Sequence, residues 1–266
     1  MPRDWQPTTL IKLSAAVHAG AGVSLILLPG FWLEALSALA ANHALLCSAG
    51  LTPRSRLLGP NLSQLPKSAI VRREIALTID DGPDPEITPL VLDLLDENRI
   101  KATFFCIGAL AARYPGLVRE IAARGHAVEN HSQHHLKRFS LLGPRQMFRE
   151  VAEAQYLLTE LTGRPPRFFR PTAGLRNPFL EPILAKLDLR LATWNRRAYD
   201  TLRPDPEIAH RRLTGGLGAG DILLLHDGNA ARHSKTPVIL PLLPLLIGTI
   251  RESGLNPVTL ERACAD

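Results

Sequence analysis

The stretch Leu77-Thr78-Ile79-Asp80-Asp81-Gly82-Pro83-Asp84 is the one around which the rest of the chain is organised. A hydrophobic run over residues 75–79 leads into two adjacent carboxylates, and a Gly-Pro pair follows at once. This pattern predicts a buried strand that ends at a sharp turn. Because successive side chains of a strand point apart, Asp80 and Asp81 can take different tasks. Taken alone, the stretch is equally compatible with a solvated turn, since Asp, Gly and Pro are ordinary turn formers.

Length and composition indicate a folded chain with one large domain, with or without an appendage. The chain has 266 residues, of which 45% are hydrophobic and 21% charged, and a formal net charge of +6. Its Lys and Arg residues are scattered and form no basic run with interleaved aromatics, which argues against a nucleic-acid partner. The three cysteines, Cys47, Cys106 and Cys264, are too far apart for a CxxC metal site and form no disulfide framework.

Residues 1–51 differ from the rest of the chain because they are almost entirely apolar or small. Two stretches, 10–28 and 31–51, flank Pro29-Gly30, and each is close to the length of about 20 residues that a membrane-spanning helix needs. We expect a helical hairpin in or on a membrane; the alternative is a hairpin buried against the main domain. Lys and Arg occur on both sides of the hairpin but not at its turn, which predicts an inner-membrane protein whose main domain faces the cytoplasm.

Residues 52–70 resemble a linker, and residues 71–266 alternate between strand-like and helix-like runs. Strands are expected at 75–79, 102–107, 127–129, 168–169, 189–194, 222–225 and 257–260. Helices are expected at 88–98, 117–124, 144–162, 178–187, 206–213 and 237–253. This alternation predicts an α/β domain with a parallel sheet or barrel.

Polar residues follow most of these strands, where a parallel barrel gathers its functional groups. They are Asp80-Asp81, then Asn130 to His135, then Arg170, then Trp194 with Asp200 six residues later, then His226-Asp227. His131 and His135 are four residues apart, so on a helical turn both imidazoles would reach one metal ion. One carboxylate would complete a two-His, one-Asp site. His134 would point away from it.

At this point the chain resembles a known family. Four ordered segments look like the motifs of the polysaccharide deacetylases, the NodB-homology or carbohydrate esterase 4 family: Thr78 to Pro83, His131 to His135, Arg170 to Gly174 and Leu224 to His226. The resemblance covers residues 71–266. It implies a deformed (β/α) barrel of the NodB-homology type, here preceded by the apolar hairpin, and metal-dependent hydrolysis of an N-acetyl group on a sugar.

The resemblance also implies a role for each site residue. Asp81, His131 and His135 would bind the metal, usually zinc. Asp80 would be the general base that takes a proton from metal-bound water, and Arg170 would hold it in place. His226 would be the general acid, oriented by Asp200. The backbone N–H of Ala173 would stabilise the oxyanion, while Leu224 would line the pocket for the acetyl methyl group and Trp194 would contact the substrate.

Two motifs depart from the family pattern. Thr172 and Ala173 stand where a proline and an aromatic residue are usual. Arg197 stands where the first aspartate after the tryptophan is usual. These departures concern the substrate more than the reaction. Arg196 and Arg197 would either receive an anionic group such as phosphate or form a solvated surface pair.

Several alternatives remain open at this stage. A two-His, one-carboxylate site also suits a non-haem iron oxygenase. A non-catalytic carbohydrate-binding relative would lack a catalytic group, and none is missing here. A deformylase or other deacylase acting on a lipid-linked sugar would use the same chemistry, and the apolar hairpin favours it. The expected partners are therefore an N-acetylated sugar of a polysaccharide, oligosaccharide or lipid-linked glycan and a membrane contacted through residues 10–51, with no nucleic acid.

Overall fold

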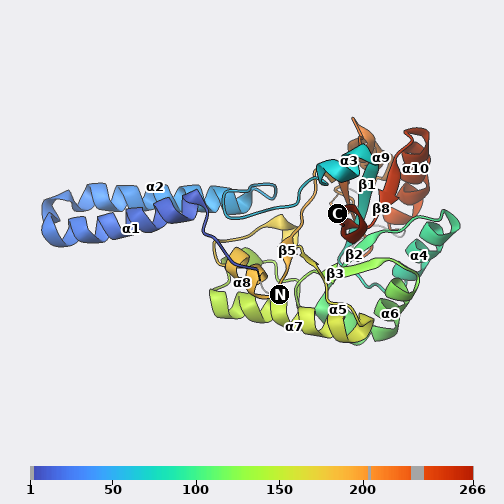
Figure 1. Ribbon diagram of the computed structural model, residues 1–266, viewed down its shortest axis with the longest axis horizontal. Coiled ribbons are helices and arrows are strands. Elements are labelled where there is room, and N and C mark those ends of the chain that lie inside the picture. Colours follow the sequence, from blue (N-terminus) through green and yellow to red (C-terminus); the bar gives the residue numbers. More distant parts are fainter. Residues whose placement is uncertain (1–2, 203–204, 229–236, 266) are drawn as a thin grey trace.

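The computed structural model describes residues 3–202, 205–228 and 237–265, and its core is one curled sheet of parallel strands (Figure 1). The strand order is β5-β4-β3-β2-β1-β7-β6, and β8 pairs with the N-terminal half of β1. No pairing joins β5 to β6 in the described part of the chain, so the sheet is an open half-barrel. This confirms the predicted deformed barrel. The strands are β1 (Glu74–Asp80), β2 (Thr103–Cys106), β3 (Ala127–Asn130), β4 (Phe168–Phe169), β5 (Arg190–Leu191), β6 (Arg196–Arg197), β7 (Ile222–His226) and β8 (Asn256–Val258).

Helices cover the outer face of this sheet, as right-handed β-α-β connections require. Every residue of the central strand β1 is buried, because apolar side chains cover it on both faces. One core cluster lies between the sheet and helices α4, α6, α9 and α10, and a second lies inside the curl. The helices are α3 (Lys67–Val71), α4 (Thr88–Glu97), α5 (Gly108–Arg113), α6 (Pro115–Ala123), α7 (Pro144–Thr162), α8 (Leu180–Lys186), α9 (Pro206–Thr214), α10 (Ile239–Glu252) and α11 (Leu260–Ala263).

Element boundaries agree with the sequence where local signals are strong and differ where tertiary contacts decide. Helix α7 and strand β4 have the predicted bounds, and Gly163 ends α7 in a left-handed conformation with φ of 70°. Strand β5 stops at Leu191 rather than 194. The predicted strand 257–260 stops at Val258, because the Thr259 side chain accepts a hydrogen bond from the Arg262 N–H and caps α11. Helix α5 was not predicted.

The segment 52–70, for which a linker is expected, packs along the open side of the half-barrel. Leu62 forms an isolated parallel bridge with Ala192, just beyond β5. The Leu65 N–H donates to the Gly220 carbonyl, 2.8 Å away and just before β7. The segment therefore spans the gap that the sheet leaves between its two edges.

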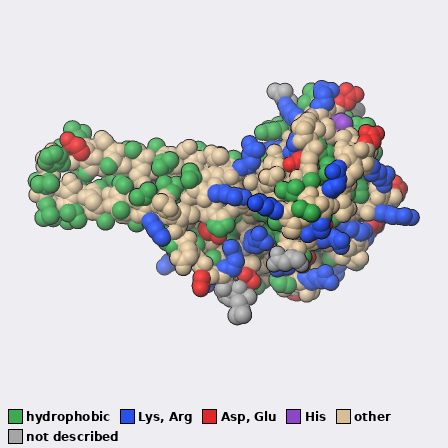
Figure 2. All heavy atoms as spheres, turned by 45° about the horizontal axis from the view of Figure 1, so that its top comes forward, with side chains coloured by type: hydrophobic (Ala, Val, Ile, Leu, Met, Phe, Trp, Pro, Cys, Tyr) green, Lys and Arg blue, Asp and Glu red, His purple; other side chains and the backbone are tan. Residues whose placement is uncertain are grey.

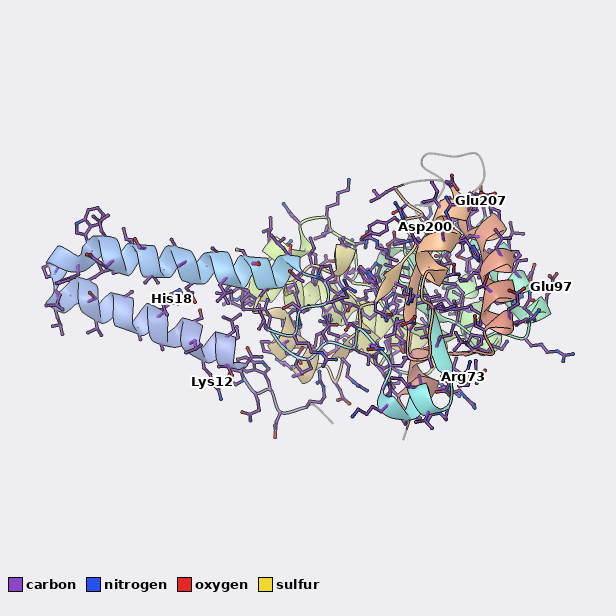
Figure 3. The ribbon with its side chains drawn as sticks, turned by 90° about the horizontal axis from the view of Figure 1, so that it is seen from above. Lys12, His18, Arg73, Glu97, Asp200 and Glu207 are labelled. Atoms are coloured by element: carbon purple, nitrogen blue, oxygen red, sulfur yellow. The ribbon has the colours of Figure 1, made fainter. Side chains whose placement is uncertain are left out.

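The N-terminal hairpin consists of α1 (Thr9–Leu27), a short 3-10 turn (Pro29–Phe31) and α2 (Trp32–Leu51), and it projects from the domain (Figures 1 and 3). Its contacts with the domain are at its base, where the Arg176 N–H donates to the Gly50 carbonyl (3.1 Å). A hairpin buried against the domain would lie lengthwise along it. This hairpin does not, because in the part of the chain that the structure describes it contacts the domain only at its base. In the described residues, α1 is long and apolar enough to cross a membrane, and α2 does not meet the same criterion.

Candidate active site

The two aspartates lie at the C-terminal end of β1, where the predicted turn begins. Asp80 is the last residue of the strand, and Asp81 has a positive φ of 76°, which ends the extended conformation. A cis peptide bond joins Gly82 to Pro83. A Cβ atom at Gly82 would lie 2.6 Å from both carboxylate oxygens of Asp227, so this turn requires glycine. Both aspartates are buried, at 2% and 6% exposure.

Asp81, His131 and His135 form a compact group of potential metal ligands. The Asp81 Oδ1 atom lies 3.2 Å from His131 Nε2 and 3.1 Å from His135 Nε2. One ligand atom from each of the three residues lies within 4.8 Å of the others. Ligands of a tetrahedral zinc ion lie about 3.3 Å apart, given zinc–ligand bonds of about 2.0–2.1 Å. The separations around Asp81 therefore fit a single divalent ion, and the donor set of two imidazoles and one carboxylate suits zinc.

The two histidines do not reach this group from a helical turn, and that prediction is wrong. Residues 131–135 have no helical conformation, and Ser132 and His135 have φ values of 64° and 50°. The Asn130 side-chain oxygen accepts the Ser132 N–H (2.9 Å), and the Ser132 hydroxyl accepts the His135 N–H (3.1 Å). These local hydrogen bonds replace the helical ones. They fold the loop so that the two imidazole centroids lie 4.7 Å apart.

The hydrogen bonding and charges of this group favour a bound cation. His131 Nδ1 lies 2.7 Å from the Arg170 carbonyl oxygen and donates to it, so Nε2 faces Asp81 and would be the ligand atom once a metal replaces its proton. Burial, followed by the charge of His131, lowers the pKa of His135 to about 4, which keeps it neutral. Burial alone would raise the pKa of Asp81, but the hydrogen bond and charge of His131 hold it well below its ordinary value.

Arg170 fixes Asp80 from inside the half-barrel. The arginine is fully buried, and its Nη1 donates to Asp80 Oδ1 (2.6 Å) and to Thr78 Oγ1 (2.8 Å). Its Nε and Nη2 donate to the carbonyls of Ala192 (3.1 Å) and Thr193 (2.9 Å). Burial lowers the pKa of Arg170, and the charge and hydrogen bond of Asp80 offset part of this shift. The Oδ1 atom of Asp80 is thus held in place. Its Oδ2 atom lies 3.8 Å from His131 Nε2, beside the potential metal ligands.

His226 and Asp200 form the second polar pair. The β1–β7 register places His226 directly beside Asp80. Its Nδ1 lies 2.7 Å from Asp200 Oδ1, and its backbone N–H donates to Asp200 Oδ2 at 2.8 Å. Burial lowers the pKa of His226, but the charge and hydrogen bond of Asp200 outweigh it and raise the pKa to about 9. This imidazole is therefore protonated at neutral pH.

A cavity of about 560 Å³, a size typical of a small-ligand site, is bordered by Asp80, Asp81, His131, His135 and His226. Ala173, Leu224 and Trp194 border it, as the resemblance implies. Ala173 lies in a 3-10 turn with φ of 55°. Ten site residues predicted from the sequence therefore lie in or directly beside one cavity: Asp80, Asp81, His131, His135, Arg170, Ala173, Trp194, Asp200, Leu224 and His226.

Three residues with no role predicted from the sequence hold the site from behind. Glu150 on α7 accepts the His134 N–H (2.9 Å) and pairs with His134 Nδ1 (2.8 Å), so it fixes the histidine loop. Thr78 donates to the Leu223 carbonyl while it accepts from Arg170. Asp227 is buried and accepts from the Thr88 hydroxyl beneath the Gly82 turn. Thr78 and Asp227 had a sequence signal, since Thr78 begins the first motif and Asp227 directly follows His226, whereas Glu150 had none.

Taken together, the half-barrel and this cavity contain the groups that hydrolysis of an amide C–N bond requires. Comparisons with known proteins agree. Residues 68–192 match the model of the family described as polysaccharide deacetylase. The chain is 33% identical over 189 residues to a peptidoglycan-N-acetylglucosamine deacetylase of Bacillus cereus, covering 70% of this chain and 86% of that one. It is 35% identical over 168 residues to a chitooligosaccharide deacetylase of Sinorhizobium fredii, covering 63% and 78%.

Solved structures show the same fold. A family 4 carbohydrate esterase from Streptomyces lividans, in complex with acetate, superposes with a TM-score of 0.63 at 31% identity, covering 69% of this chain and 91% of that one. A peptidoglycan N-acetylglucosamine deacetylase bound to a naphthyl N-hydroxybenzamide superposes with a TM-score of 0.68 at 27% identity, covering 76% and 92%. The chain belongs to the polysaccharide deacetylase family, which confirms the resemblance seen in the sequence.

Proposed function

We propose that this protein removes the N-acetyl group of an amino sugar by metal-dependent hydrolysis, most readily with zinc. The observation that carries the proposal is the single cavity bordered by the Asp81–His131–His135 group, by Asp80 and by His226. Amide hydrolysis needs a nucleophile, a base and an acid, and each has a separate residue or group here. When bound by Asp81, His131 and His135, a divalent ion would polarise the amide carbonyl and lower the pKa of water to about 7.

Asp80 is the proposed general base. It lies beside the metal group, its carboxylate faces the same cavity, and Arg170 fixes its orientation through a 2.6 Å contact to Oδ1. The Oδ2 atom, which lies 3.8 Å from His131 Nε2, is the one placed to accept a proton from water at the ligand group. Holding the base in one rotamer before the substrate arrives reduces the reorganisation that the reaction requires.

His226 is the proposed general acid, and it protonates the leaving amine through Nε2. Its Nδ1 contact with Asp200 leaves Nε2 directed away from the aspartate, and the raised pKa supplies a proton at neutral pH. Asp200 therefore both orients and charges the acid. The Ala173 N–H would stabilise the oxyanion, Leu224 would contact the acetyl methyl group, and Trp194 would pack against the sugar.

Acetate release is the direct test of this proposal. We expect the purified protein to release acetate from N-acetylglucosamine oligosaccharides, to lose activity at least about 100-fold on chelation, and to regain it with zinc. His131→Ala should lose zinc binding, whereas His134→Ala, which changes an exposed residue paired with Glu150, should keep it. Full activity in the chelated protein would contradict metal dependence. Formate release in place of acetate would favour the deformylase alternative.

We further propose that the hairpin anchors the protein in a lipid bilayer. Large apolar side chains cover its outer surface, and Figure 2 shows them gathered at its far end. Apart from Leu10 and Gly50 at its base, the buried residues form a narrow seam of mostly small side chains spaced seven apart: Ser14 and Ala21 on α1, and Ala35, Asn42 and Ala49 on α2. Helices that pack within a membrane have small residues at the helix–helix interface and large apolar residues on the outer surface.

Two polar side chains of the hairpin bond within it, one between its two helices and one within α1, which suits a bilayer. Asn42 Nδ2 donates to Ser14 Oγ (3.0 Å), and His18 Nδ1 lies 2.7 Å from the Ser14 carbonyl oxygen. The charged residues lie near its ends: Lys12 toward the domain (Figure 3) and Glu34 beside the tip turn. A helix of 19 residues is about 28 Å long, close to the hydrocarbon thickness of about 30 Å.

Membrane insertion can be tested with one charge. Val23→Asp places a carboxylate at an exposed position of α1, which should weaken insertion by up to about 2.5–3.5 kcal/mol at the bilayer centre. We expect the wild type to float with liposomes and the variant to lose most of this association. The matched control is Leu141→Asp, which changes an exposed leucine of the domain. Equal flotation of Val23→Asp and wild type would contradict insertion.

The proposed side of the membrane is the cytoplasmic face, because Lys and Arg flank the hairpin on both ends and are absent from its turn. In inside-out membrane vesicles the catalytic domain should then be cleaved by added protease. Protection in those vesicles would place it on the opposite face.

A further inference from the structure

Two adjacent arginines of β6 have opposite surroundings, and only one of them borders the active-site cavity. Side chains alternate along a strand, so Arg196 and Arg197 point to opposite faces of the sheet. The β6–β7 register sets Arg197 beside Leu224, which lines the cavity, and Arg196 beside Leu223, which belongs to the outer core cluster. The sequence treats the two as a pair, but the structure separates them.

All three guanidinium nitrogens of Arg196 make structural contacts. Its Nε donates to Asp221 Oδ2, its Nη1 to the Gly215 carbonyl (2.6 Å) and its Nη2 to the Gly216 carbonyl. Asp221 also accepts from Asn195 and from the Gly218 N–H. This arginine ties β6 to the turn before β7, and it does not border the cavity.

Arg197 is held in place by aromatic rings and keeps its donors for a ligand. Its guanidinium carbon lies 5.4 Å from the centroid of Trp194 and 4.8 Å from that of Tyr199. Within the described part of the chain the guanidinium forms no ion pair, and its Nε is buried without a hydrogen-bond partner. A buried donor without a partner is costly, and an acceptor supplied by a ligand would remove that cost. Stacking on two rings pre-orients the planar fork for such an acceptor.

A second cation borders the same cavity. Lys137, in the loop after β3, lines it together with Arg197 and forms no ion pair with the described residues. The acidic groups of the cavity lie elsewhere in it: Asp80 is paired with Arg170, and Asp81 lies against the two histidines. The cavity therefore combines the Asp81–His131–His135 group with two cations that have no counter-ion among the described residues.

We propose that Arg197, assisted by Lys137, binds an oxyanion carried by the substrate, so that the protein selects an acylated amino sugar bearing a phosphate or carboxylate group. This inference rests on the proposed deacetylation. Arginine recognises both oxyanions through paired charge-assisted hydrogen bonds, and lysine adds a point charge. Arg197 is thus a specificity-determining residue: it contacts a part of the substrate that does not react.

The test compares three substrates that differ in charge: N,N′-diacetylchitobiose, N-acetylglucosamine 1-phosphate and N-acetylmuramic acid. We expect the wild type to have a kcat/KM at least about 10-fold higher for one of the charged sugars than for the neutral one. The charged sugar that is preferred identifies the oxyanion as phosphate or carboxylate. Arg197→Gln should reduce this charged-to-neutral ratio by about 10- to 100-fold, and Arg197→Lys should restore part of it.

Arg212→Gln is the matched control. Arg212 stacks on Tyr199 (5.2 Å), is exposed and does not border the cavity. The variant therefore removes one positive charge near Arg197 without changing the lining of the cavity. Its charged-to-neutral ratio should equal that of the wild type. Added salt should lower the ratio more in the wild type than in Arg197→Gln, because screening acts on the charge contact.

Calorimetry with the product analogues glucosamine 1-phosphate, muramic acid and glucosamine tests the oxyanion site without turnover. Tighter binding of a charged sugar to the wild type than to Arg197→Gln supports the inference. The inference is overturned if the neutral sugar binds and reacts as well as both charged ones, or if Arg197→Gln lowers all three equally. Absence of turnover on every substrate, with charge-selective binding retained, would count against the proposed deacetylation and not against the oxyanion site.

Discussion

Replacing Asp80 with asparagine is expected to lower kcat by about 100- to 10,000-fold, the contribution usual for a positioned general base. Asparagine has nearly the shape of aspartate and keeps an oxygen for the 2.6 Å contact with Arg170 Nη1. It cannot accept a proton at neutral pH. Because Asp80 is not in the ligand group of Asp81, His131 and His135, zinc should still bind.

Single-turnover acetate release and zinc titration measured on the same preparation would separate these effects. Asp93→Asn is the matched control, since Asp93 lies on α4 with its side chain 57% exposed and does not border the cavity. It should retain wild-type kcat and zinc affinity. Full activity in Asp80→Asn would show that another group takes the proton, and loss of zinc would show that Asp80 is a ligand.

Replacing Arg170 with methionine is expected to lower the free energy of unfolding by about 3–5 kcal/mol, the cost of removing one partner of a buried ion pair. The variant leaves the Asp80 carboxylate buried without its counter-ion, and the carbonyls of Ala192 and Thr193 lose their donors. It also removes a guanidinium that stacks 4.0 Å from the Phe105 ring centroid. Arg170 therefore stabilises the inside of the half-barrel as well as the proposed base.

Denaturant unfolding in detergent measures this loss, with Arg190→Met as the control. Arg190 is an exposed arginine on β5 that stacks over Phe168, so the control removes a guanidinium of the same size from the surface. It should cost less than about 1 kcal/mol. A similar small loss in Arg170→Met would mean that the Arg170–Asp80 pair contributes no net stability.

The sequence predicted the fold class and most of the site because both depend on local patterns. Apolar runs with a Gly-Pro stop indicated β1, and the spacing of polar residues after each strand indicated where the cavity lies. In a parallel sheet the carboxyl ends of the strands share one edge. Residues as distant as Asp80 and His226 are therefore expected together, and the β1–β7 register pairs them directly.

Other features depended on contacts that no local pattern carries. The HxxxH spacing suggested a helix. Instead the segment is a loop, with positive φ values at Ser132 and His135 and with backbone N–H groups that donate to the side chains of Asn130 and Ser132. Glu150 supports that loop from a helix that begins nine residues further along the chain. Such a contact leaves no periodic signal, and neither does the bridge between Leu62 and Ala192 across the open edge of the sheet.

The sequence by itself determined that two aspartates end a buried strand and that histidines and an arginine follow later strands, because hydrophobic periodicity and turn residues are local properties. Only the tertiary structure decided which side chain faces which partner. Asp80 meets Arg170 because both lie inside the curl of the sheet. Arg197 borders the cavity while Arg196 does not, because the pairing of β6 with β7 fixes which face each side chain takes.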